Sequence, residues 1–300
     1  MTHRAIAVIA VFVALASLGA AQAHRQAHSK AIDDMTLGAE ARLGEGTVSS
    51  FARFDGGRNP LAIGVVFSAE ALASPPTARS DEHRCFDVDA DGAIEPDTEC
   101  LATHERVIPL PTEASRRADI PFKWVLLNWN PAGHIPPEIY GPPHFDIHFY
   151  IESIENTFAL MPGPCGPEML RCDQFERAVR PLPWNYMHPD FSNVDAAVPA
   201  MGNHLIDLTS PEFHGEVFTR TWIYGAYDGR VTFYEEMVTV DYLSTRPDVC
   251  YDIKAPAAVE LAGHYPTKSC FRYDARTGEQ TVSMEGFVYR EASPPAPADE

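Results

Sequence analysis

The stretch "HFDIHFY" at residues 144–150 alternates two histidines and an aspartate with large apolar residues. Side chains two residues apart lie on the same face of a β-strand, so His144, Asp146 and His148 share one face. The other face carries Phe145, Ile147 and Phe149. Neutral imidazoles and a carboxylate suit Zn²⁺ and other divalent transition-metal ions. The spacing predicts a metal or catalytic site, unless these side chains form only the polar face of a half-buried strand.

A metal ion on this strand would need ligands from elsewhere in the chain, or an open position for water. The candidates lie near predicted strand ends or in loops: His134, His188, His204, Glu235 and Glu236. The predicted ligand set is His144, His148, His204, Asp146 and Glu235. An ion held there would activate a water for hydrolase-like chemistry. Glu235 comes close only if the strands at 144–151 and 230–243 pair, which the sequence does not fix.

The acidic segment "DVDADGAIEPDT" at residues 87–98 resembles the loop of an EF-hand, although its flanks do not resemble two helices. Alternate carboxylates on a curled loop can direct several hard oxygens at one Ca²⁺ ion. The predicted ligands are Asp87, Asp89, Asp91, Glu95 and the backbone carbonyl of Ala93. Thr98 stands where a bidentate glutamate is expected, but Asp97 and Glu99 flank it and could supply a shifted ligand. We expect a structural calcium loop, with an acidic surface turn as the alternative.

The chain has six cysteines, and no two of them form a C-x-x-C pair. An even number in an exported chain favours disulfides over redox catalysis or a zinc knuckle. Pairing between sequence neighbours predicts the bonds Cys85–Cys100, Cys165–Cys172 and Cys250–Cys270, although spacing alone leaves other connectivities open. Neither a G-x-S-x-G motif nor a phosphate-binding or dinucleotide-binding glycine pattern is present, which argues against those reaction classes.

Residues 1–23 have the features of a secretory signal peptide. A basic start is followed by the apolar run "AIAVIAVFVALASLGA" and by the small-residue pattern Ala21-Gln22-Ala23. The run is short for a membrane span, so an uncleaved N-terminal anchor is the less favoured alternative. No later stretch is apolar enough to span a bilayer. We predict a secreted or periplasmic protein with no integral membrane segment after cleavage.

The chain carries 42 acidic and 23 basic side chains, for a formal net charge of −19. Such a surface repels nucleic acid and anionic lipid, so we expect no nucleic-acid partner. It suits divalent cations or cationic partners, but acidity alone does not identify a small-molecule ligand.

Short runs of β-branched and aromatic residues, separated by Pro and Gly, predict a mainly β chain. Strands are expected at 61–69, 123–130 and 144–151, and hairpins at 215–243 and 270–290. Asp228-Gly229 would form the turn of the first hairpin. The fold class predicted is an antiparallel β-sandwich or barrel with long Pro-rich loops and at most one or two short helices, the best helical window being 168–179.

The domain organisation follows from composition. One β-rich domain is predicted over residues 51–290. Residues 24–50 are polar with weak periodicity, and we expect partial order there. Residues 291–300 are Pro-rich and acidic, which predicts a disordered tail.

Three long segments together resemble a bacterial secreted family. They are "NWNPAGHIPPEIYGPPHFDIHFYI", "MGNHLIDLTSPEF" and "FTRTWIYGAYDGRVTFYEEMVTVDYL". The family is a domain of unknown function whose structural prototype is a sigma-E-controlled protein of Thermus thermophilus, and the likeness covers residues 100–245. It implies an extracytoplasmic, β-rich, oligomeric protein and brings no established reaction. The positions that match its pattern are His134, His144, Asp146, His148, His204, Asp228, Gly229 and Glu235.

Two functions stay open at this point. The first is an exported binding or assembly protein, expected to form a homo-oligomer, with a structural Ca²⁺ loop. The second is a metal-dependent enzyme that uses the histidine strand to hold Zn²⁺ or another divalent transition metal.

Overall fold

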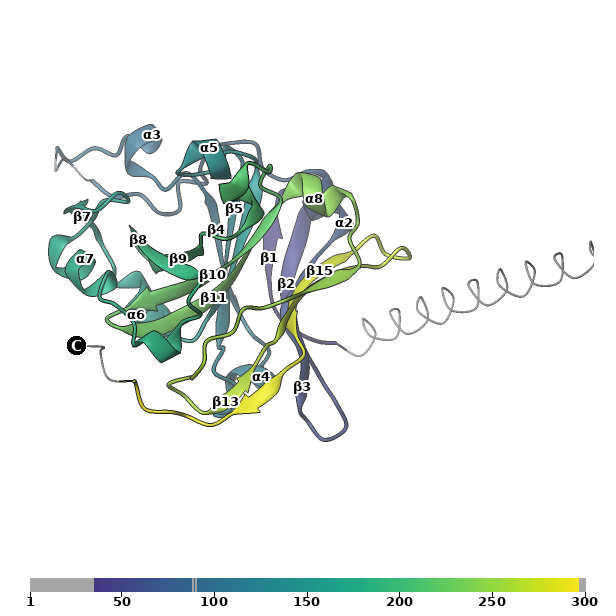
Figure 1. Cartoon of the computed structure of the whole chain (residues 1–300). Helices are drawn as coiled ribbons and strands as arrows, with labels where there is room; N and C mark the ends of the chain where they lie inside the picture. Colours follow the sequence, from purple (N-terminus) through teal and green to yellow (C-terminus); the bar gives the residue numbers. More distant parts are fainter. Residues whose placement is uncertain (1–34, 88, 90, 297–300) are drawn as a thin grey trace, which may run out of the picture.

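The computed structural model describes residues 35–296, apart from residues 88 and 90, and this part of the chain is mainly β. Two large antiparallel sheets pack together in a sandwich-like arrangement (Figure 1). This confirms the predicted fold class and selects the sandwich over the closed barrel. The predicted signal peptide, residues 1–23, lies outside the described residues. None of the helices in the described part is long and apolar enough to cross a membrane.

The larger sheet has seven strands and contains the histidine strand in its interior, next to the central strand. In spatial order its strands are β4 (His104–Pro109), β5 (Trp124–Asn130), β6 (His144–Tyr150), β11 (Arg230–Thr239), β10 (Arg220–Tyr227), β9 (Gly202–Asp207) and β8 (Phe191–Val198). The histidine strand is therefore β6, flanked by β5 and β11. Strands β10 and β11 form the predicted hairpin, whose turn residues Asp228 and Gly229 both have positive φ, as a tight hairpin turn requires.

The second sheet has six strands and includes the N-terminal part of the described chain. Its order is β1 (Thr36–Leu43), β2 (Gly46–Phe54), β3 (Pro60–Phe67), β15 (Gln280–Glu285), β14 (Lys268–Tyr273) and β12 (Val249–Asp252). The expected domain start at residue 51 falls inside β2, so the sheet begins earlier than composition suggested. Two smaller pieces complete the strands, namely the pair β13 (Gly263–Tyr265) and β16 (Val288–Arg290), and β7 (Pro162–Cys165).

The two sheet faces that meet form the main hydrophobic core. On β6 this face carries Phe145, Ile147 and Phe149, each at most 1% exposed. The ring of Phe145 lies 5.0 Å from that of Phe67 on β3. Burying side chains of this size stabilises the fold by roughly 1.5–3 kcal/mol each. The apolar half of the alternating pattern therefore anchors β6, and its polar half must face away from the six-stranded sheet.

Short helices are more numerous in the described chain than the one or two expected. They are α2 (Ala69–Ala73), α3 (Pro96–Glu99), α4 (Thr112–Ser115), α5 (Pro137–Tyr140), α6 (Ile154–Phe158), α7 (Cys172–Ala178), α8 (Val240–Ser244), η1 (Trp184–Tyr186) and η2 (Pro211–His214). Most begin at a Ser or Thr cap or at a Pro in a loop. One or two turns are too short to show a helical period, which is why the sequence pattern missed them.

All three predicted disulfides are confirmed: Cys85–Cys100, Cys165–Cys172 and Cys250–Cys270. Part of the expected disordered tail is also tied to the body of the protein. The carbonyl of Ser293 accepts a hydrogen bond from the Tyr186 hydroxyl, and the backbone N–H of Ala296 donates to the side chain of Asn185. The remaining tail residues, 297–300, lie outside the described part.

Candidate metal centre in a buried cavity

The polar face of β6 is buried, not solvent-exposed. His144, Asp146 and His148 are 0%, 6% and 1% exposed. They lie on the side of the seven-stranded sheet away from the six-stranded sheet, where segments carrying α3, β7 and α7 project beyond the strands (Figure 1). Between this sheet face and the loops is a cavity of about 440 Å³, lined by Asp146 and Glu235 among other residues. The strand is therefore buried on both faces, not half-buried, and burial alone does not decide between a site and a structural polar face.

Strand pairing brings Glu235 to the histidine strand. Strand β11 pairs with β6 so that Glu235 is directly opposite His148 and Met237 is opposite Asp146. Directly opposed residues on a sheet have Cβ atoms about 5 Å apart, which allows their side chains to touch. The pairing that the sequence left open thus supplies the predicted carboxylate.

His204 reaches the same place from β9, with β10 between it and Glu235 on β11, and both β10 and β11 between it and His148 on β6. Its register partner on β10 is Gly225, which has no side chain to block the approach. A Cβ at Gly225 would lie 2.1 Å from the ring of Phe233. That ring in turn packs against both imidazoles, 5.0 Å from His148 and 5.1 Å from His204 between ring centroids. Gly225 therefore makes room for the aromatic ring that supports both histidines.

His148, His204 and Glu235 form a compact group that we call the deep triad. The Nδ1–H of His148 donates to the Leu126 carbonyl at 3.1 Å, and the Nδ1–H of His204 donates to the Ala196 carbonyl at 3.0 Å. A carbonyl can only accept, so these bonds fix the tautomer and leave both Nε2 lone pairs free when the rings are neutral. The two Nε2 atoms face each other at 3.4 Å. The Glu235 carboxylate lies 3.5 Å from the first and 3.8 Å from the second.

Burial sets the protonation of the deep triad. It lowers the pKa of His148 to about 3, with a further contribution from the neighbouring His204, and it lowers the pKa of His204 to about 4. Both imidazoles are therefore neutral at pH 7, which is the form that binds metal ions. Burial, together with the charges of Asp146 and Glu236, raises the pKa of Glu235 well above its ordinary value. Its Oε2 atom is buried and has no hydrogen-bond partner.

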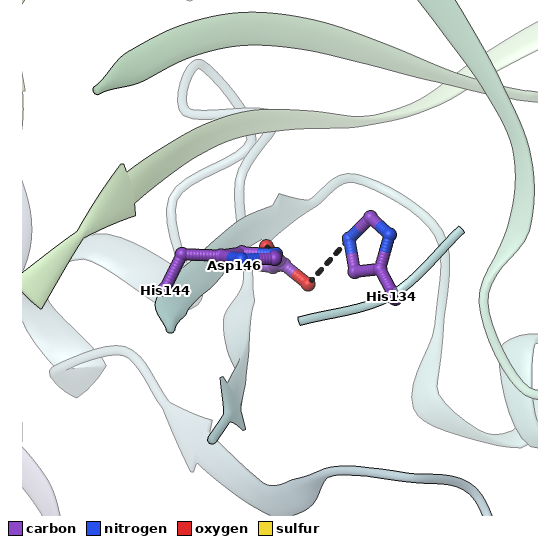
Figure 2. Close-up of side chains that lie close together, drawn as sticks. All are labelled: His134, His144 and Asp146. Atoms are coloured by element: carbon purple, nitrogen blue, oxygen red, sulfur yellow. Dashed lines mark ion pairs between the residues drawn. The ribbon is translucent and has the colours of Figure 1, made fainter. Parts of the chain in front are cut away.

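A second group, which we call the outer triad, consists of His134, His144 and Asp146. His134 lies on the loop between β5 and β6, and Figure 2 shows the carboxylate of Asp146 directed at its ring. The Nε2 atom of His144 is 3.2 Å from Asp146 Oδ1, and that of His134 is 3.5 Å from Asp146 Oδ2. Burial alone would raise the pKa of Asp146, but the two histidines outweigh it and hold this pKa well below its ordinary value.

The predicted set of five ligands is thus divided between two groups. The ligand atoms of His144 and Asp146 converge with that of His134, whereas those of His148 and Glu235 converge with that of His204, and within the described residues no group of ligand atoms lying within 4.8 Å of one another contains all five. Of the further candidates, His134 joins the outer triad, whereas His188 lies beside Asp190. Glu236 points to the opposite face of the sheet and pairs with Arg220.

Other polar residues that line the cavity were not singled out in the sequence. Asn128 on β5 is 1% exposed, and neither atom of its amide makes a hydrogen bond. The feature of the sequence that could have pointed to Asn128 is its place within the apolar run of the strand predicted at 123–130. The buried Tyr140 hydroxyl also has no partner, and Glu168 reaches the cavity from the loop closed by the Cys165–Cys172 bond.

The acidic loop brings together a set of carboxylates that differs in part from the prediction. Asp87 and Asp89 converge with Glu99, with one oxygen from each lying within 4.8 Å of the others. Glu99 is 7% exposed and is the shifted residue next to Thr98. Glu95 is not one of the three, although it stands at the N-cap position of α3 and its carboxyl lies near enough to Glu99 and Asp89 to interact with them. The Asp91 carboxylate accepts a bond from the backbone N–H of Ala93.

Comparison with known proteins adds no family to these observations: no family model, curated protein or solved structure matches the chain. The resemblance to the secreted family over residues 100–245 therefore stays a prediction. Functional inference for this protein depends on the geometry of the cavity.

Proposed function

We propose that this protein is an exported metalloprotein whose deep triad holds one divalent transition-metal ion, with Zn²⁺ as the favoured occupant, and that the ion promotes hydrolysis of a small molecule in the cavity. The observation that carries the proposal is the opposed pair of Nε2 atoms, 3.4 Å apart, beside a buried carboxylate oxygen with no hydrogen-bond partner. Two imidazoles and one carboxylate are a common zinc-enzyme ligand set.

The distances within the deep triad support this assignment. Two ligands of a tetrahedral ion, each bound at 2.0–2.1 Å, are separated by roughly 3.3–3.4 Å. The two Nε2 atoms already have this separation, and the carboxylate oxygens need to move by only a few tenths of an ångström. Backbone carbonyls orient both rings, as the outer-shell partners of metal-bound histidines commonly do.

The cavity supports a reaction in preference to a purely structural ion. Three protein ligands leave at least one coordination position open, as in catalytic zinc sites. His204 and Glu235 line the cavity, so that position faces a space of a size suited to a small organic molecule. A bound divalent ion supplies a Lewis acid and an activated water. Apolar side chains complete the lining, among them Met201, Ile206, Ile223 and Met237.

The extracytoplasmic part of the proposal rests on two features. The pattern of residues 1–23 is typical of a signal peptide, and the chain has three disulfides, which persist in oxidising compartments. Within the same proposal the acidic loop binds Ca²⁺ structurally through Asp87, Asp89 and Glu99. The Cys85–Cys100 bond closes that loop and holds its two ends together.

The test is metal binding by the purified full chain, stripped with a chelator and dialysed against Zn²⁺ with excess Ca²⁺ to occupy the acidic loop. We expect the His148→Ala/His204→Ala variant to bind one Zn²⁺ fewer than the unmodified protein. The matched control is His83→Ala/His214→Ala, which removes two exposed histidines and should change nothing. Equal Zn²⁺ content in all three proteins contradicts the proposal.

The alternative function, a binding or assembly protein with only a calcium loop, makes a different prediction. It expects no specific transition metal and no turnover. A loaded protein that hydrolyses a chromogenic ester or phosphoester, with the rate lost in the double variant and kept in the control, excludes this alternative. A bound ion without turnover on such a panel favours a metal-dependent binding role.

A further inference from the structure

We propose that the outer triad of His134, His144 and Asp146 is a second site for a divalent transition-metal ion, distinct from the deep triad and open to the same cavity. The proposal uses none of the deep-triad residues. It can therefore hold or fail independently of the function proposed above.

The imidazoles of the outer triad are oriented as metal ligands. The Nδ1–H of His144 donates to the Pro142 carbonyl at 2.7 Å, and the Nδ1–H of His134 donates to the Ile135 carbonyl at 2.9 Å. Each ring therefore presents Nε2 to the interior of the group. This is the same device that orients the deep triad, a backbone carbonyl on the far nitrogen of each ring. All three residues offer a ligand atom within 4.8 Å of the others.

The closest pair in the outer triad is not joined by a hydrogen bond. His144 Nε2 and Asp146 Oδ1 are 3.2 Å apart, yet both atoms are buried and neither has a hydrogen-bond partner. The ring nitrogen and the carboxylate oxygen are near each other but misaligned for N–H···O contact. Two buried, unpartnered donor atoms at this separation match adjacent ligands of one ion, which lie roughly 3.0–3.4 Å apart at metal–ligand distances of about 2.0–2.1 Å.

The carboxylate of the outer triad is held in place by a neighbour. The side-chain N–H of Asn130 on β5 donates to Asp146 Oδ2 at 2.6 Å. Asn130 is directly opposite His144 in the pairing of β5 with β6. Hydrogen bonds of this kind fix ligating carboxylates in metal sites.

The two sites differ in access. The His134 side chain is 37% exposed, whereas His148 and Glu235 in the deep triad are at most 2% exposed. Glu168, which also lines the cavity, lies near enough to His134 for their charges to interact. The outer ion should therefore exchange with solvent faster than the deep ion.

The experiment measures Zn²⁺ bound per chain, with excess Ca²⁺ present, for the full-length protein and site variants. We expect two Zn²⁺ in the unmodified protein, one in His134→Ala and one in His148→Ala/His204→Ala. His134→Ala is the main variant because the side chain is partly exposed on a loop, so the fold should be kept, which circular dichroism checks. His83→Ala is the matched control and should keep both ions. In a release assay with a chromogenic chelator, the ion that His134→Ala removes should be the faster of two phases.

The outcomes separate this site from the deep centre. One Zn²⁺ in the unmodified protein that is kept in His134→Ala and lost in His148→Ala/His204→Ala overturns the outer site and supports the deep one. If the unmodified protein binds one Zn²⁺ that is lost in His134→Ala and kept in His148→Ala/His204→Ala, the deep site is overturned and the outer site is supported. Unchanged Zn²⁺ content in a folded His134→Ala/Asp146→Asn protein also overturns the outer site.

Discussion

Glu235 and Glu236 are neighbours on β11, and they show how differently the two faces of one sheet treat a buried carboxylate. Both are at most 1% exposed, and burial raises the pKa of both. Glu236 faces the six-stranded sheet, where Arg220 donates to its Oε1 at 2.7 Å and Ser269 donates to its Oε2 at 2.7 Å. Glu235 faces the cavity, where two neutral imidazoles are its ionisable partners within contact distance.

The two faces of the sheet differ in how they satisfy a buried carboxylate. Burying a carboxylate without a cation is costly, and folded proteins normally pair or hydrogen-bond such groups. On the face toward the six-stranded sheet, which we call the core face, Glu236 follows this rule by pairing with Arg220. The cavity face leaves unpartnered atoms on Glu235, Asp146, His144, Asn128 and Tyr140. Under the two proposals above, ions held by the deep and outer triads would satisfy the acceptor atoms of Glu235, Asp146 and His144.

The largest effect should come from breaking the pair on the core face. Glu236→Ala leaves Arg220 buried without its partner, and removing one member of such a pair costs about 3–5 kcal/mol of unfolding free energy. Urea denaturation measures it. Glu235→Ala, the matched change on the cavity face, should destabilise the metal-free protein far less, because no cation of the chain loses a partner. Equal losses in the two variants would remove the distinction between the faces.

The next effect is stabilisation by metal on the cavity face. Zn²⁺ at 100 times its dissociation constant for the deep triad should stabilise the unmodified protein by about 2.7 kcal/mol through that site. Glu235→Gln removes a ligand charge and should abolish most of the deep site's share of the gain, whereas Glu236→Gln should keep it. Thermal melts with and without Zn²⁺ make the comparison. A full Zn²⁺ response in Glu235→Gln contradicts the deep site.

A smaller effect should follow from filling the space at Gly225. In Gly225→Ala the new Cβ would collide with the Phe233 ring, and overpacking of this kind costs about 1–3 kcal/mol. Because Phe233 supports both imidazoles, Zn²⁺ affinity should fall as well, which calorimetric titration would detect. Gly56→Ala is the control, since a Cβ there meets nothing within 4 Å. Unchanged affinity in Gly225→Ala would show that Phe233 does not position the ligands.

The smallest effect is expected at the acidic loop, far from both faces of the sheet. Ca²⁺ at ten times its dissociation constant should add about 1.4 kcal/mol of stability. Asp89→Ala should remove this response, and so should Glu99→Gln, whereas Asp173→Asn on the exposed side of α7 should not. Melts with Ca²⁺ and with Mg²⁺ are the measurement. If Ca²⁺ does not raise the melting temperature, the alternative holds and residues 87–98 form only an acidic surface turn.

Local patterns predicted much of the fold. Alternation identified β6, the turn at Asp228-Gly229 identified the β10–β11 hairpin, and neighbouring cysteines identified the disulfides. These features depend on short-range geometry, which the sequence contains directly. The short helices and the inclusion of β1 and β2 in the sheet were missed, because capped single turns, the edge strand β1 and the mixed small and polar residues of β2 carry weak periodic signals.

The candidate site was predicted in its residues but not in its arrangement. Strand alternation alone places His144, Asp146 and His148 on one face, because the period of a strand is two. The position of β11 beside β6, the approach of His204 past Gly225 and the burial of this face by loops are visible only in the folded chain. Those contacts join segments far apart in the chain, and their register depends on packing of the whole sandwich. The same packing divides one predicted ligand set into two triads.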